Sequence, residues 1–169
     1  MTADQPLGEI QRNGDRPVLR YERHLAHPPE KVWAAITESE HLQHWLPADI
    51  VGERREGVAI ELRFWRDHVE KYQIPMEAMP GRITVWDPTS VFEWEWDTDL
   101  VRFELTPDGD GTMLVLTTWL SHKSGDPNKT AAGYHVCLDN LTELLDTGGV
   151  TTPLVDVPVA DLEARYAEV

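Results

Sequence analysis

The strongest constraint on the fold is a run of alternating segments that is followed by one long amphipathic helix. Alternation of apolar and polar residues predicts strands over residues 17–26, 58–66, 81–87, 91–97, 100–106 and 112–120. The links "DPTS" and "TPDGDG" are rich in turn residues, and strands joined by such short links pair as an antiparallel meander. Residues 128–146 then place apolar side chains at helical spacing, and Gly148 and Gly149 follow as a stop signal.

Two short helices are predicted between the first strand and the others. Pro29 stands where a helix can start, Val32 and Ile36 lie on one helical face, and Pro47 ends the second helix. A curved sheet needs cover on its concave face, and only the last helix is long enough to supply it. The sequence therefore predicts an α+β fold with a cavity between the sheet and this helix.

The predicted domain organisation is a core with two extensions. Residues 1–16 are polar and are expected to form a flexible arm. Residues 17–147 form the domain, and residues 148–169 form a tail whose short helix packs on it. Residues 66–80 are longer than a turn requires, so they either extend a strand or form a mobile flap over the cavity.

The amino-acid composition argues against some classes of binding partner. The chain has 30 acidic and 15 basic residues, and a net charge of −15 repels both nucleic acid and anionic membranes. Its single Cys allows no internal disulfide, and no apolar stretch is long enough to span a bilayer. The first residues lack the pattern of a signal peptide. We expect a cytoplasmic protein with neither a nucleic-acid nor a membrane partner.

The segment "AAGYHVCLDNL" brings His135, Cys137 and Asp139 within five positions. On a helix, His135 and Asp139 share a face, whereas Cys137 lies about 200° from His135. The three side chains cannot converge on one atom, so a triad on this segment is excluded. We interpret His135 and Asp139 as a local pair and Cys137 as a small apolar group in the packing.

Metal and cofactor signals are weak. His41 and His44 have a spacing that can ligate a metal, but the zinc-protease pattern of two His four apart with an intervening Glu is absent. The sequence also contains neither a glycine-rich phosphate loop nor a Gly-x-Ser-x-Gly turn. We therefore expect no metal, no cofactor and no assigned catalytic residue.

Aromatic residues alternate with carboxylates in the strand "VFEWEW". Phe92, Trp94 and Trp96 occupy one face, and Glu93 and Glu95 occupy the other. Because burial of two unpaired carboxylates is costly, the aromatic face is predicted to point inward. It either packs as plain core or lines a ligand pocket.

Four separated segments resemble a known family in the right order: "AHPPEKVWAAITESEHLQHWLP", "GRITVWDPTSVFEWEW", "VRFELTPDGDGTMLVLTT" and "AAGYHVCLDNLTELLD". They are similar to the SRPBCC superfamily, which includes START and Bet v 1-like proteins, and to its branch of activator of heat shock protein 90 ATPase homologues. The resemblance covers roughly residues 17–147. It implies the helix-grip fold, in which an antiparallel sheet of about seven strands wraps around a long C-terminal helix over an apolar cavity. Thr118 stands where the family often has His.

Three functions follow from this resemblance and the residues. The favoured one is binding of a small apolar or aromatic molecule, and the expected lining is Trp45, Phe64, Phe92, Trp94, Trp96, Phe103, Leu116, Thr118, Tyr134, His135 and Leu138. The second is a polyketide cyclase-like or hydrolase-like enzyme, for which Arg23, His135 and Asp139 are the candidate acid–base groups. The third is a chaperone-activator-like module that binds a protein partner through the outer sheet face, around Trp65, Trp86 and Trp119. A homodimer is a further expectation.

Overall fold

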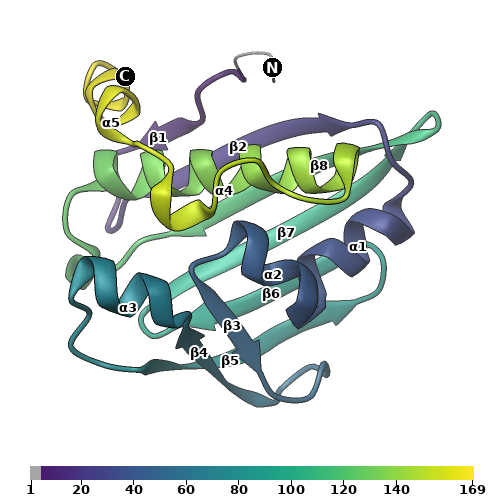
Figure 1. The fold of residues 1–169 in the computed structure, drawn as a ribbon, viewed down its shortest axis with the longest axis horizontal. Coiled ribbons are helices and arrows are strands. Elements are labelled where there is room, and N and C mark those ends of the chain that lie inside the picture. The colour runs from purple at the N-terminus through teal and green to yellow at the C-terminus, as the bar shows by residue number, and fades with distance from the viewer. Residues whose placement is uncertain (1–4) are drawn as a thin grey trace.

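The structure, a computed structural model, describes residues 5–169 (Figure 1). The sheet contains β1 (Glu9–Gln11), β2 (Val18–Leu25), β3 (Ala48–Val51), β4 (Ala59–Phe64), β5 (Ala78–Asp87), β6 (Val91–Trp96), β7 (Asp99–Asp108) and β8 (Gly111–Trp119). The helices are α1 (Pro29–Thr37), α2 (Ser39–Trp45), α3 (Arg66–Tyr72), α4 (Pro127–Thr147) and α5 (Ala160–Ala167), with short 3₁₀ turns η1 (His122–Ser124) and η2 (Leu154–Asp156). Within residues 5–169, no helix combines the length and apolarity needed to cross a bilayer.

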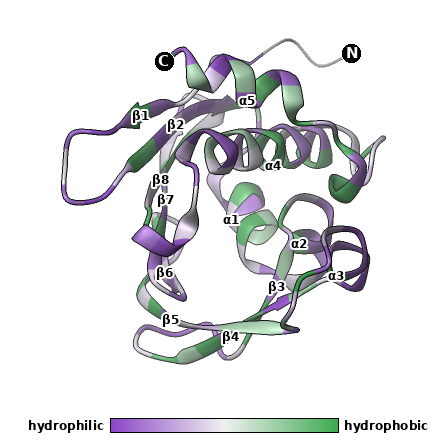
Figure 2. Ribbon diagram, turned by 90° about the vertical axis from the view of Figure 1, so that its left-hand side faces the viewer, coloured by the Kyte–Doolittle hydropathy of each residue, from purple (hydrophilic) through white to green (hydrophobic). Residues whose placement is uncertain are grey.

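The strands form one antiparallel sheet in the order β1-β2-β8-β7-β6-β5-β4-β3. The sheet curves around α1, α2 and α4, which all lie on its concave side (Figures 1 and 2). This arrangement confirms the predicted α+β helix-grip class. The resemblance implied about seven strands, and the sheet in residues 5–169 has eight; the short edge strands β1 and β3 are the two that the alternation patterns did not predict.

Local sequence signals fix the ends of α4. The Asp126 side chain accepts a hydrogen bond from the Asn128 N–H at 2.9 Å, and Pro127 occupies the first helical position. Gly148 ends the helix with φ of 85°, in the left-handed region that favours glycine. These caps set a 21-residue helix, which is long enough to cover the concave face of the sheet.

The inner face of the sheet carries the aromatic core. Phe92 and Trp94 are fully buried, Glu95 is exposed, and Glu93 pairs with Arg102 at 2.8 Å. The inward orientation predicted for the aromatic side chains of β6 is therefore confirmed. The ring centroids of Phe92 and Trp94 lie 6.2 Å apart, and those of Trp94 and Trp96 lie 5.4 Å apart, both in tilted contacts.

A β-bulge changes the predicted outer surface. The register between β5 and β6 shifts between Ile83 and Val85, so the residues after the shift change faces. Trp86 consequently turns inward and packs 5.1 Å from the ring of Trp33 in α1. Trp65 also packs against the core, and its indole N–H donates to the Leu46 carbonyl at 2.8 Å.

The prediction of an outer-face patch around Trp65, Trp86 and Trp119 is therefore wrong for Trp65 and Trp86. Of the three, only Trp119 stays on the outer face. Trp119 is half-buried between inward-facing Thr118 and Leu120, as strand alternation requires.

Residues 66–80, predicted to extend a strand or form a flap, divide into two elements. Arg66–Tyr72 fold as α3, which ends at Gln73 in the left-handed region with φ of 50°. Residues 78–80 then extend β5. Alternation could not reveal α3, because one short helix between two strands leaves too few residues to show a period.

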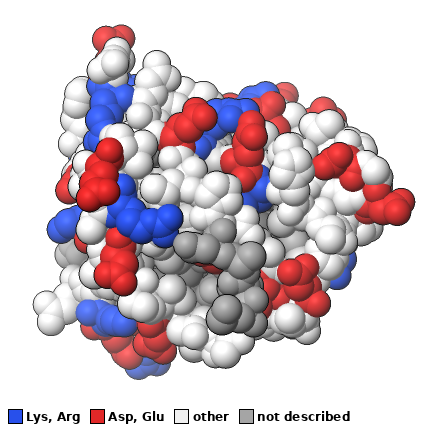
Figure 3. Space-filling view, turned by 90° about the horizontal axis from the view of Figure 1, so that it is seen from above, with Lys and Arg blue, Asp and Glu red and all other residues white. Residues whose placement is uncertain are grey.

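Both chain extensions contact the domain in the described residues. Residues 1–4 of the predicted arm lie outside them, and Glu9–Gln11 pair with β2 as β1. In the tail, η2 and α5 run back along α4 (Figure 1), where Tyr166 is fully buried. Acidic and basic side chains are interspersed over the face shown in Figure 3.

Candidate functional site

A cavity of about 320 Å³ opens where the tail, α3 and the first half of α4 meet the sheet. We call it the tail cavity. Its wall is mostly apolar and consists of Pro47, His68, Tyr72, Trp96, Lys129, Thr130, Gly133, Tyr134, Val136, Cys137, Leu154, Val157 and Val159. Since a water molecule takes up about 30 Å³ of liquid, the cavity has room for roughly ten non-hydrogen atoms.

Segments far apart in the sequence build this wall. Trp96 ends β6, and Gly133, Tyr134 and Cys137 lie along one flank of α4. The tail supplies Leu154, Val157 and Val159, which follow the end of α4. The sheet packs against one side of α4 and the tail packs against another. The cavity therefore lies where the sheet, α4 and the tail meet.

Contacts between α3 and the tail close one side of the cavity. The Lys71 ammonium donates to the Val155 carbonyl at 2.6 Å and lies 3.7 Å from the Asp156 carboxylate. The Tyr72 hydroxyl donates to the same carbonyl at 3.4 Å. These exposed or partly buried contacts are individually weak, so they hold the two segments together without locking them.

The predicted lining residues separate into two groups. Trp96 and Tyr134 line the tail cavity. The other predicted residues lie away from it in the packed interior, where Phe64 is half-buried and the rest are buried: Trp45, Phe64, Phe92, Trp94, Phe103, Leu116, Thr118, His135 and Leu138. The reason is that the concave face, which the sequence suggested would enclose a cavity, is filled by α1, α2 and these side chains.

Sequence reasoning missed the walls that come from α3 and the tail. His68 is the polar example: its side chain is 7% exposed, and it lies in the segment for which no helix was predicted. The only available signal was an Asp–His pair in a stretch too long for a turn. Leu154, Val157 and Val159 gave only the general indication of an apolar tail.

The proposed acid–base residues lie together elsewhere, where Arg23 and His135 are buried and Asp139 is half-buried. The His135 Nε2 atom lies 3.5 Å from Asp139 Oδ2, which confirms the predicted local pair, and Arg23 Nη2 lies 3.9 Å from Asp139 Oδ1. The His135 Nδ1 atom shares a 2.8 Å hydrogen bond with the Tyr166 hydroxyl, which also accepts from the Gly8 N–H at 2.8 Å. Arg23, His135 and Asp139 do not line the tail cavity. Through the Tyr166 hydroxyl and the Gly8 N–H, their cluster instead joins the tail and the N-terminal segment to α4.

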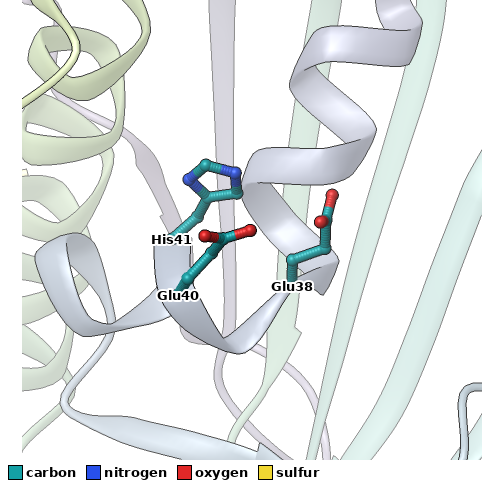
Figure 4. A group of neighbouring side chains, drawn as sticks. All are labelled: Glu38, Glu40 and His41. Carbon is teal, nitrogen blue, oxygen red and sulfur yellow. The ribbon is translucent and has the colours of Figure 1, made fainter.

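Three potential metal-ligand side chains gather at the start of α2. Ligand atoms of Glu38, Glu40 and His41 lie within 4.8 Å of one another (Figure 4). Both carboxylates are exposed and His41 is only half-buried. The predicted partner His44 is not in the group. Exposed acidic groups of this kind are common on helix surfaces, so we assign no function to this cluster.

Burial shifts the pKa of three groups around α4 in the same direction. It raises the pKa of Cys137 to about 12, and it also raises the pKa of Tyr21 and of Tyr134. In each case loss of solvation disfavours the charged form. Cys137 therefore stays a neutral thiol at physiological pH, as expected for a cysteine that serves in packing.

Alkaline pH is consequently expected to destabilise the protein. Above about pH 8.5 the unfolded chain releases protons that the folded chain retains, so the free energy of unfolding falls as pH rises. Each raised group adds a slope of up to about 1.4 kcal/mol per pH unit. Urea unfolding at pH 8 and at pH 10.5 measures the fall, and Cys137→Ala should make it shallower. An equal free energy at both pH values contradicts the prediction.

Comparison with known proteins identifies a family that matches this sequence. The family described as "Activator of Hsp90 ATPase homolog 1-like protein" matches residues 26–146. No curated protein matches the sequence significantly.

Solved structures share the architecture. The conserved protein EF2215 of unknown function from Enterococcus faecalis is 22% identical, with a TM-score of 0.75 over 95% of this chain and 88% of that one. CalU16 from Micromonospora echinospora is 18% identical, with a TM-score of 0.64 over 96% and 90%. The Aha1 dimer from Colwellia psychrerythraea is 21% identical, with a TM-score of 0.62 over 78% and 97%. Identities this low show the fold alone.

The matched segment spans α1 to α4 and includes most of the sheet, the aromatic core and one flank of the tail cavity. The chain therefore belongs to the family of activator of Hsp90 ATPase homolog 1-like proteins.

Proposed function

We propose that this protein binds a small apolar or aromatic molecule in the tail cavity. The observation that carries the proposal is the wall of that cavity, which is largely apolar and is formed by Trp96, Val136 and the tail residues Leu154, Val157 and Val159. Ligand sites in proteins are typically concave and apolar with a few polar groups. Trp96 and Tyr134 are the two residues of the predicted lining that this proposal retains.

The size of the cavity sets the scale of the ligand and its affinity. Roughly ten non-hydrogen atoms fit, which corresponds to one or two fused rings. At about 0.5–0.8 kcal/mol per atom, such a ligand would have a dissociation constant between about 1 µM and 200 µM. Trp96 lines the sheet side of the cavity, and an aromatic side chain there favours contact with a flat aromatic ligand.

The first test is native mass spectrometry of the protein purified from its own host, followed by identification of any released molecule. We expect one bound molecule per chain, with an apolar ring system. The same spectra give the number of chains per particle and so test the expected homodimer. Calorimetric titration with one-ring and two-ring aromatic compounds then measures binding directly. An empty protein that binds no compound of the series contradicts the proposal.

A further inference from the structure

A histidine in the wall of the tail cavity has one ring nitrogen without a hydrogen-bond partner among residues 5–169. His68 in α3 is 5% exposed and lines the cavity, and its Nδ1 lies 3.1 Å from Asp67 Oδ1. Because an ionised carboxylate can only accept, Nδ1 carries the proton. In the neutral ring the other nitrogen, Nε2, is then a hydrogen-bond acceptor, and no protein donor in the described chain reaches it.

Most other polar groups of the wall are already engaged or face solvent. Thr130 Oγ1 donates to the Asp126 carbonyl at 3.4 Å, and the Tyr72 hydroxyl donates to the Val155 carbonyl. Lys129 is exposed, so its ammonium group can be hydrated. The Tyr134 hydroxyl lies near Thr118, but the two form no hydrogen bond in the described residues, so it is a second polar group that a ligand can contact. His68 Nε2 is therefore an acceptor in this wall that a bound molecule is placed to satisfy.

Asp67 gives His68 a defined orientation. Its Oδ1 also accepts the His68 backbone N–H at 2.9 Å, so one carboxylate oxygen contacts both the backbone and the ring of the next residue. Asp67 is exposed, so water hydrates the remainder of its charge. Asp67 is therefore a positioning residue that fixes the proton on Nδ1 and leaves Nε2 as acceptor.

We propose that His68 makes the tail cavity selective for aromatic molecules that carry one hydrogen-bond donor, as a phenolic hydroxyl or ring N–H does. This inference rests on the proposed binding function. A ligand donor that is buried without a partner loses its hydrogen bonds to water. The His68 acceptor loses its own hydration when a ligand without a donor covers it. A hydroxyl that reaches Nε2 removes both losses, whereas a methyl group in the same place leaves the acceptor unsatisfied.

The test compares 2-naphthol with 2-methylnaphthalene, which has the same ring system with a methyl group in place of the hydroxyl. Calorimetry gives the ratio of their dissociation constants for the wild type and for His68→Phe. We expect the preference for 2-naphthol to fall about tenfold in His68→Phe, because the substitution removes the acceptor but keeps an aromatic ring. His68→Gln, which restores an acceptor, should recover part of the preference.

A matched control makes the same change at a histidine outside the cavity. His24 lies on β2, is exposed, and its Nδ1 lies 3.0 Å from Asp108 Oδ2. His24→Phe should leave the ratio unchanged. If His68→Phe does not fold, Asp67→Ala takes its place: loss of the carboxylate frees the ring to adopt the other tautomer, and the preference for 2-naphthol should fall severalfold.

The outcomes separate this inference from the function on which it rests. If the wild type binds both compounds in the tail cavity and the ratio is the same in His68→Phe, the role of His68 is overturned while the binding function stands. If the wild type binds neither compound, nor any other of the aromatic series, both are overturned. A ratio that changes equally in His24→Phe also overturns the role of His68.

Discussion

We expect Gly133→Leu to abolish binding of aromatic ligands in the tail cavity while the protein stays folded. Gly133 lies on the flank of α4 that lines the cavity, and a Cβ atom added there would meet no atom of residues 5–169 within 4 Å beyond the adjoining helix backbone. An isobutyl group at this position therefore occupies ligand space without disturbing the core. We expect affinity to fall at least about a hundredfold, or about 3 kcal/mol, because the ligand and the new side chain compete for one volume.

Gly133→Ala is the matched control. It adds only a methyl group and relieves the entropic cost of glycine inside a helix, so the free energy of unfolding should rise by about 0.5–1 kcal/mol. Calorimetric titration of 2-naphthol and urea unfolding of the three proteins measure both effects. Unchanged affinity in a folded Gly133→Leu protein would show that the ligand binds elsewhere, and the tail cavity would lose its proposed function.

We expect Tyr166→Ala to lower the free energy of unfolding by about 3–5 kcal/mol. Tyr166 is fully buried although it lies close to the C-terminal end of the chain, and its ring packs edge-to-face 5.8 Å from that of His135. Its hydroxyl also accepts from the Gly8 N–H, so the substitution removes packing of α5 and the attachment of the N-terminal segment together. For a domain of this size the melting temperature should fall by roughly 10 °C or more.

Two further variants separate the contributions of Tyr166. Tyr166→Phe keeps the ring but leaves the Gly8 N–H and His135 Nδ1 without this partner, which should cost about 1–3 kcal/mol. Val169→Ala changes an exposed residue at the same end of the chain and should stay within about 0.5 kcal/mol of the wild type. Urea unfolding followed by circular dichroism gives all the values. A cost below about 1 kcal/mol for Tyr166→Ala would contradict the packing of the tail described above.

Elements with a long or clean period were predicted from the sequence. The alternation of Phe92, Glu93 and Trp94 follows from the geometry of a strand, so the inward aromatic face needed no knowledge of neighbouring strands. The start of α4 at Asp126–Pro127 and its end at Gly148 follow from capping preferences that act within one turn of a helix. The separation of His135 from Cys137 followed from helical geometry in the same way.

Features that depend on a partner segment were not predicted. The face occupied by Trp86 was assigned wrongly, because the bulge in β5 is defined by the register with β6 and not by the residues of β5 alone. The short helix α3 is held by contacts with the tail, through Lys71 and Val155, that no local pattern encodes.

The sequence by itself determined the class of fold, the inward aromatic strand and the long capped helix, because hydrophobic period and capping act over a few neighbouring residues. Only the tertiary structure decided where the cavity lies and which polar group faces it. The tail cavity is lined by Trp96 of β6, His68 of α3 and Gly133 of α4, and the return of the tail along α4 adds Val157 to them. Whether a side chain lines a cavity or fills a core depends on the volume left between packed elements, and that volume depends on all of them at once.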